Sequence, residues 1–199
     1  MSIGVQIRDD DGSLYFETSA RVLNGVPDFA AKMGEVSAAW AFAEGHLGCV
    51  YAELLETTPE QAIQQLGKDG AQRLTDKARK FACTRLNDDD LASLIELLER
   101  MDKVRCQRNR VQHDLWSWRV GDNSALYAVH VDSYRQLLLE VIHNKNEPNG
   151  AKLAIHAADR YAMKAENRFT LQNLEELRSE IESVSIGLFE FFLNRVGSK

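Results

Sequence analysis

The sequence predicts an all-α protein: an antiparallel four-helix bundle with short β-hairpins and a helical insertion. Two observations predict this fold class. Apolar residues recur at steps of three and four over long segments, as they do along one face of an α-helix. Short polar connections between the first of these segments favour antiparallel neighbours. Because 199 residues can bury a sizeable core, we expect one domain over 1–199.

An N-terminal hairpin is expected within residues 1–25. Val5 and Ile7, and then Leu14 and Phe16, alternate with other residues, which is the period of a β-strand. The Asp11-Gly12 pair between them is typical of a tight hairpin turn.

Residues 26–131 are expected to supply the first three bundle helices and a second hairpin. A long helix begins at Pro27, since proline suits the first helical turn, and its apolar stripe runs to Leu54. Thr58-Pro59, with a glutamine three residues after the threonine, caps a second helical stretch. This stretch runs to about Leu86 and is broken near its glycines.

The "NDDD" run at 87–90 caps the third helix. After Trp116 the apolar period falls to two, which predicts the second hairpin. Residues 132–167 form an insertion with two short helices around a turn-rich stretch. Thr170 then caps the final helix, within 168–195.

Composition limits the classes of partner. The net charge of −6 argues against a protein that coats nucleic acid by bulk electrostatics. From Glu99 to Arg119, however, the sequence has six basic residues and three acidic ones, and this local excess of positive charge suits a polyanion. The alternative for this patch is a solvated helix face with ion pairs within the helix.

Neither a membrane span nor a secretory signal is expected. No apolar run approaches the roughly 20 residues that a spanning helix needs, and the N-terminus lacks a basic-then-apolar layout. Cys49, Cys83 and Cys106 are widely spaced and form no C-x-x-C pair, which fits free thiols in the cytoplasm.

Phosphate-loop and dinucleotide motifs are absent from the sequence. Glu140 and His143 form one E-x-x-H, but a carboxylate di-iron bundle needs a second such pair and two further glutamates. We therefore expect no metal site and no cofactor.

The stretch "RNRVQHDLW" carries the candidate chemistry. Asn109 and His113 are four residues apart and share a helix face, which Arg105 extends by another turn. A histidine can move a proton near neutral pH, and the forked cation of Arg108 can neutralise charge on phosphorus. The alternative is a helix C-terminus where cations complement the dipole and His113 caps carbonyls.

This stretch resembles the R-N-x-x-x-H signature of HEPN domains near the end of the third helix. The order of elements is also similar, over roughly residues 26–131 and 168–195. The resemblance implies an all-helical homodimer with its two motifs facing each other. Many HEPN proteins are metal-independent endoribonucleases, often toxins or defence effectors, and others are non-catalytic binding modules.

Carried onto this sequence, the resemblance implies that Arg108 and His113 are catalytic and that Asn109 positions them or the phosphate. We expect Arg105 and Arg110 to contact RNA through their charge. Asp114 would favour the protonated form of His113, or would repel phosphate and mark lost activity. The expected partners are RNA, a second copy of the chain, and an antitoxin or regulatory protein, with no membrane or DNA partner.

Overall fold

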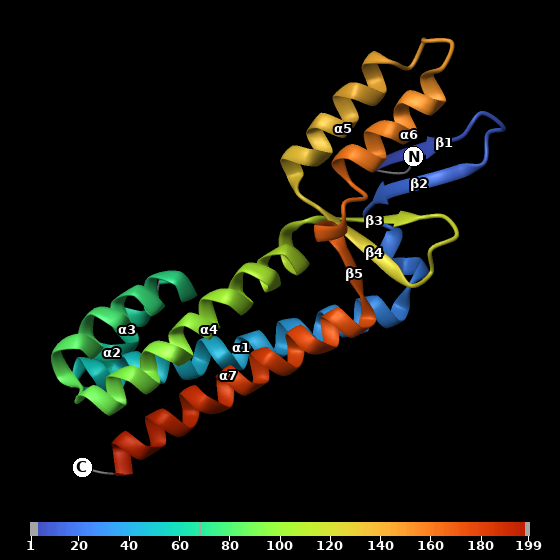
Figure 1. Cartoon of the computed structure of the whole chain (residues 1–199). Helices are drawn as coiled ribbons and strands as arrows, with labels where there is room; N and C mark the ends of the chain where they lie inside the picture. The colour runs from blue at the N-terminus through green and yellow to red at the C-terminus, as the bar shows by residue number, and fades with distance from the viewer. Residues whose placement is uncertain (1–3, 68, 198–199) are drawn as a thin grey trace. The chain divides into compact units, whose positions relative to one another are not determined.

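The computed structural model describes residues 4–67 and 69–197. Across these residues it contains seven α-helices and one five-stranded antiparallel sheet (Figure 1). The expectation of an all-α protein is therefore wrong, although most of the chain is helical. Two compact units are present. The sheet unit joins residues up to Gly34 with Asn109–Glu175, and the helical unit joins Glu35–Arg108 with residues from Glu176 onward.

Both predicted hairpins are confirmed in the sheet unit. The strands follow one another in chain order: β1 (Gly4–Arg8), β2 (Leu14–Ser19), β3 (Leu115–Arg119), β4 (Ala125–Val129) and β5 (Arg168–Thr170). Gly12 and Gly121, in the two hairpin turns, have φ angles of 85° and 87°, a left-handed conformation that glycine adopts without steric cost.

The hairpins are not separate decorations, because β2 pairs with β3. Thr18 lies opposite Ser117 in that pairing, and their hydroxyl groups are 2.7 Å apart. Alternation along a strand predicts which face is buried but not which strand lies alongside. The sequence therefore predicted the two hairpins and missed the sheet that unites them.

The two helices predicted within 132–167 are confirmed as α5 (Val131–His143) and α6 (Gly150–Tyr161). They contribute to the core of the sheet unit: Leu137 and Ala158 are buried in one cluster with Ile7, Phe16 and Val129. This cluster shows that the segment predicted as an insertion is part of the hydrophobic core. Two 3-10 turns, Val22–Gly25 and Ala165–Asn167, also lie in this unit.

The other helices are α1 (Pro27–Leu55), α2 (Pro59–Leu66), α3 (Ala71–Arg85), α4 (Asp88–His113) and α7 (Leu171–Gly197). The second predicted stretch is thus two helices, with its break at the expected glycines. The predicted caps are confirmed. Thr58 accepts from the Gln61 amide, Asn87 accepts from the Asp90 amide, and Thr170 accepts from the Asn173 amide.

Within the helical unit, α4 runs antiparallel to α7. The ion pair Arg195–Asp90 links the end of α7 with the beginning of α4, and Arg100–Glu180 links the middle of α4 with an earlier turn of α7. Buried residues such as Leu98 and Ile181 fill the space within the unit. This part of the predicted bundle is antiparallel, as expected.

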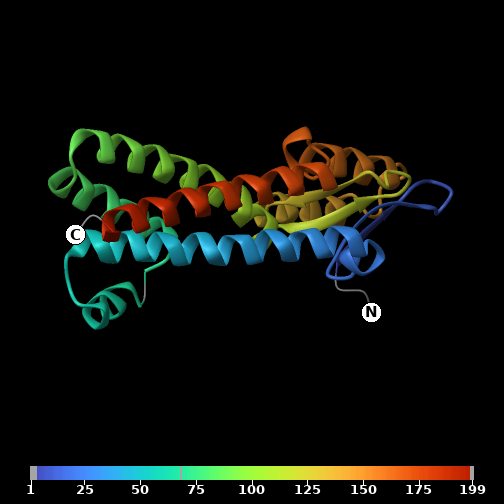
Figure 2. The ribbon, with the colours of Figure 1, turned by 90° about the horizontal axis from the view of Figure 1, so that it is seen from below.

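Helices α1 and α7 instead lie side by side and parallel (Figures 1 and 2). Arg178 pairs with Glu35 near the start of the contact, and Ser185 Oγ lies 2.9 Å from His46 Nδ1 about two turns later along α7 and three turns later along α1. The expectation of a wholly antiparallel bundle is therefore wrong for this pair.

Candidate functional site

The R-N-x-x-x-H motif forms the last two turns of α4, and His113 is the final residue of that helix. Its imidazole is exposed, whereas Asn109 is half-buried. The motif therefore ends the helix, as predicted from its position in the sequence. That helix is the fourth in chain order rather than the third, because the second predicted stretch is two helices.

Arg108 is half-buried in the helical unit, where its guanidinium carbon lies 5.4 Å from the centre of the Trp40 ring. A cation over an indole face is attracted by the ring's negative face. Trp40 is almost fully buried, so this contact holds Arg108 against a rigid surface. Sequence reasoning placed Trp40 in the apolar stripe of α1 but did not connect it with the motif.

Arg105 is also partnered inside the helical unit. Its guanidinium donates to Asp102, three residues earlier, with an Nη2–Oδ1 distance of 3.3 Å. Asp102 additionally accepts from Arg79 of α3 at 2.7 Å. This arrangement matches the alternative for the basic patch, a helix face with internal ion pairs. RNA contact by Arg105 stays a prediction.

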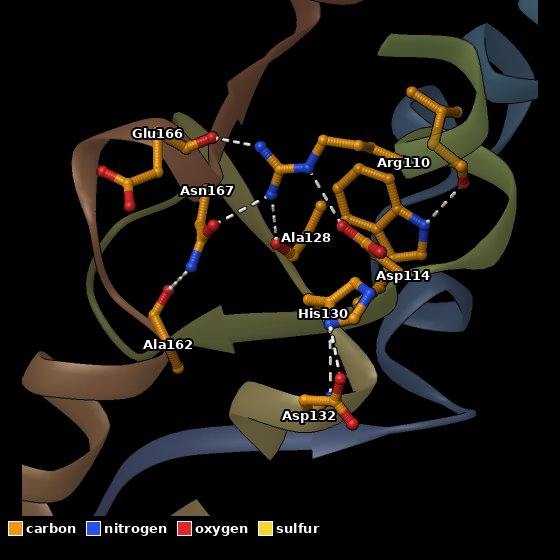
Figure 3. A network of polar contacts seen from close by, with 10 residues as sticks. Arg110, Asp114, Ala128, His130, Asp132, Ala162, Glu166 and Asn167 are labelled. Carbon is orange, nitrogen blue, oxygen red and sulfur yellow. Dashed lines mark hydrogen bonds and ion pairs between the residues drawn. The ribbon is translucent and has the colours of Figure 1, made fainter. Parts of the chain in front are cut away.

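Arg110 belongs to a dense network in the sheet unit (Figure 3). Its Nε donates to Asp114 Oδ2 at 3.0 Å, and its Nη2 donates to the Ala128 carbonyl at 2.8 Å and to Asn167 Oδ1 at 2.9 Å. A further donor reaches the Glu166 carbonyl. The guanidinium therefore joins the end of α4 to β4 and to the turn before β5.

The rest of this network satisfies buried groups. Asn167 is buried, and its amide nitrogen donates to the Ala162 carbonyl at 2.9 Å. The Phe169 ring centre lies 5.6 Å from the Arg110 guanidinium carbon. Four intramolecular acceptors account for most of the five N–H donors of Arg110. These bonds give Arg110 a structural role that does not require RNA. RNA contact by Arg110 stays a prediction.

Sequence reasoning missed Asn167 and Phe169, which lie more than fifty residues after Arg110. No local signal pointed to them, because an asparagine in a turn-rich segment is ordinarily a turn residue. Asp114 was singled out as a partner of His113. Its carboxylate, only 6% exposed, accepts from Arg110, and an effect on His113 stays a prediction.

No cluster of metal-ligating side chains occurs in the part of the chain that the structure describes: no three histidine, cysteine, aspartate or glutamate residues gather there in a suitable group. The three cysteines are free thiols. Between residues 4 and 197, residue 68 aside, none of the helices has the length and apolar character needed to cross a bilayer.

Comparison of this chain with protein-family models, with curated proteins and with solved structures gives no match.

Proposed function

We propose that the chain is a metal-independent endoribonuclease of the HEPN type, acting on single-stranded RNA. The observation that carries the proposal is the position of His113, whose imidazole is exposed at the last residue of α4. Arg110 fixes the preceding turn against the sheet, so the histidine stands at the end of a rigid element. A proton-transfer group needs such positioning to be effective.

The reaction needs only side chains and the RNA itself. The 2′-oxygen of a ribose attacks the adjacent phosphorus, and the bond from phosphorus to the 5′-oxygen breaks. One His113 takes the proton from the 2′-hydroxyl, the second His113 of a homodimer gives one to the leaving 5′-oxygen, and Arg108 offsets the charge that builds on the phosphate. The products are a 2′,3′-cyclic phosphate and a free 5′-hydroxyl group.

A homodimer completes the site in this proposal. Arg108 and His113 are five residues apart, which on an ideal helix is about 140° of rotation, so one helix does not aim both at one phosphate. Two copies whose α4 ends face each other allow Arg108 of one protomer to act with His113 of its partner. Asn109, one turn before His113, would orient the phosphate.

An RNA cleavage assay in EDTA tests the proposal. Wild-type protein should cut a mixed-sequence RNA, and His113→Ala should lose about 100-fold or more of the rate, the usual contribution of a proton-transfer group. His143→Ala is the matched control, because His143 is also an exposed histidine at the last residue of a helix, α5. Equal loss in both variants would contradict a specific role for His113.

The second candidate is a non-catalytic HEPN-like homodimer that binds nucleotide, RNA or a protein partner such as an antitoxin. The ion pairs of Arg105 with Asp102 and of Arg110 with Asp114 favour it, because they neutralise two cations of the motif region within the chain. Binding of a fluorescent RNA without cleavage under any condition would support this candidate over the enzyme.

A further inference from the structure

The sheet unit contains a pocket of about 350 Å³. One of the residues that line it is Asp114, which directly follows His113. Its lining includes Thr18 of β2, Ala20 in the turn after β2 and Leu23 of the following 3-10 turn. It also includes Asp114 and Trp116, around the start of β3, and Tyr134 of α5. This volume lies at the lower end of the range for small-molecule sites and suits one ring system.

Two aromatic residues give the pocket a rigid wall. The Trp116 indole nitrogen donates to the Val111 carbonyl at 3.2 Å, and its ring meets Phe169 edge-on with the centroids 5.7 Å apart. Tyr134 packs against the core of the sheet unit. Because these contacts fix the rings, a ligand that binds beside them does not have to order them first.

Asp114 is the one charged residue among the described residues that line the pocket. Its ionised carboxylate only accepts hydrogen bonds, and its two oxygens have lone pairs beyond the one that Arg110 uses. The nearby Thr18 hydroxyl is already paired with Ser117. The pocket therefore favours a ligand that is flat, uncharged and rich in N–H donors.

We propose that this pocket binds an unstacked RNA base, with guanine preferred. Guanine presents two adjacent N–H donor groups on its Watson–Crick edge, which suit the two oxygens of one carboxylate, whereas adenine, cytosine and uracil each present only one donor group there. Asp114 directly follows His113 in the chain, so in this proposal the 3′-phosphate of the bound base lies toward the end of α4 that carries His113. The choice of RNA as the source of the base rests on the proposed ribonuclease function.

Binding of free nucleosides tests this pocket apart from catalysis, because a nucleoside has no phosphate to contact or cleave. Ligand-observed NMR with the full chain should show guanosine binding about tenfold or more tightly than adenosine, cytidine or uridine. On RNA, wild-type protein should cut predominantly after guanosine.

The variant Ala20→Phe fills the pocket from its rim. Ala20 is exposed in the turn after β2, so the substitution disturbs no buried group. It should weaken guanosine binding at least about tenfold, the loss expected where a fitted ring is excluded. Ala92→Phe, at an exposed alanine of α4 outside the pocket, is the matched control and should bind as wild type does.

Asp114→Asn tests the preference itself, since an amide adds a donor where guanine needs an acceptor. The Asp114→Asn variant should no longer bind guanosine more tightly than adenosine. Because this change also breaks the Arg110 pair, Ala20→Phe remains the deciding variant for the location of the ligand.

The outcomes separate the two proposals. RNA cleavage without any nucleoside binding overturns the pocket assignment and leaves the ribonuclease. Guanosine binding that Ala20→Phe abolishes, without RNA cleavage, overturns the ribonuclease and supports the pocket. Equal binding of all four nucleosides, or binding that Ala20→Phe leaves unchanged, overturns the guanine site.

Discussion

Arg110 and Asp114 form an ion pair across one helical turn, with Nε and Oδ2 3.0 Å apart and the carboxylate side chain only 6% exposed. The pair lies where α4 gives way to β3, so it fixes the direction in which the chain leaves the helix. The sequence suggested a chemical role for these two residues, and in the structure they stabilise the junction between α4 and β3.

Arg110→Ala should destabilise the protein markedly. The change removes four hydrogen bonds and leaves the buried Asp114 carboxylate without its cation, a loss of about 3 kcal/mol. Denaturant unfolding followed by circular dichroism measures it. Arg135→Ala, at an arginine 69% exposed, is the control and should cost less than about 0.5 kcal/mol. Similar stability of the two variants would contradict the structural role of Arg110.

His113→Ala and Arg108→Ala should leave the fold nearly intact. His113 is exposed, so its loss should cost no more than about 0.5 kcal/mol. Arg108→Ala also removes the contact with Trp40, which contributes about 0.5–1 kcal/mol to stability. Thermal unfolding checks both values. If His113→Ala lowered the melting temperature as much as Arg110→Ala does, capping of the helix would explain the histidine better than proton transfer.

Cleavage should require the ribose hydroxyl and no divalent metal ion. The nucleophile in the proposed reaction is the 2′-oxygen of the substrate, so DNA and 2′-O-methyl RNA should remain intact while unmodified RNA is cut in EDTA. Electrophoresis of the three substrates and mass analysis of the ends, which should carry 2′,3′-cyclic phosphate, provide the measurement. Activity that vanished with chelator and returned with Mg²⁺ would contradict the metal-independent mechanism.

The chain should be a dimer at micromolar concentration. Gln112 is exposed beside His113, so Gln112→Arg adds a cation to a surface expected to face its own copy and should weaken the association. Gln65→Arg, at an exposed glutamine of α2, is the control. Light scattering with size-exclusion chromatography gives the mass. A wild-type monomer, or equal effects of the two substitutions, would speak against an interface at the motif.

The stability contributed by Asp122 should depend on pH. Its carboxylate accepts from the Ser124 hydroxyl at 2.6 Å and from the Ser124 amide at 3.0 Å, and these bonds, with Arg168 nearby, hold the pKa of Asp122 below its ordinary 3.8. A lowered pKa stabilises the fold above the unfolded-state value, and that contribution is lost as pH falls through the folded-state value.

Asp122→Asn should therefore destabilise the protein at pH 7, by less than about 1 kcal/mol because the side chain is partly exposed. The difference from wild type should shrink as the pH falls below about 4. Urea unfolding of wild type and variant at pH 7 and at a pH below about 4 measures this difference. Asp10→Asn, in the other hairpin turn, is the control. A difference that grew on acidification would contradict the sign of the pKa shift.

Local features of the sequence determined most of the elements. Apolar steps of three and four predicted α1, α4 and α7, and the caps at Thr58, Asn87 and Thr170 predicted where helices begin. Period-two segments on either side of a turn predicted both hairpins. These signals suffice because a cap or a periodic face acts within one or two turns of backbone.

Tertiary structure alone decided which surfaces meet. The pairing of β2 with β3, the parallel contact of α1 with α7, and the addition of β5 to the sheet follow from no local pattern. The same holds for Arg110, whose positive charge predicted a phosphate contact, whereas in the fold it meets Asn167, 57 residues away. A side chain's chemistry is set by its own atoms, but its partner is set by which distant segments are buried together, and sequence spacing does not record that.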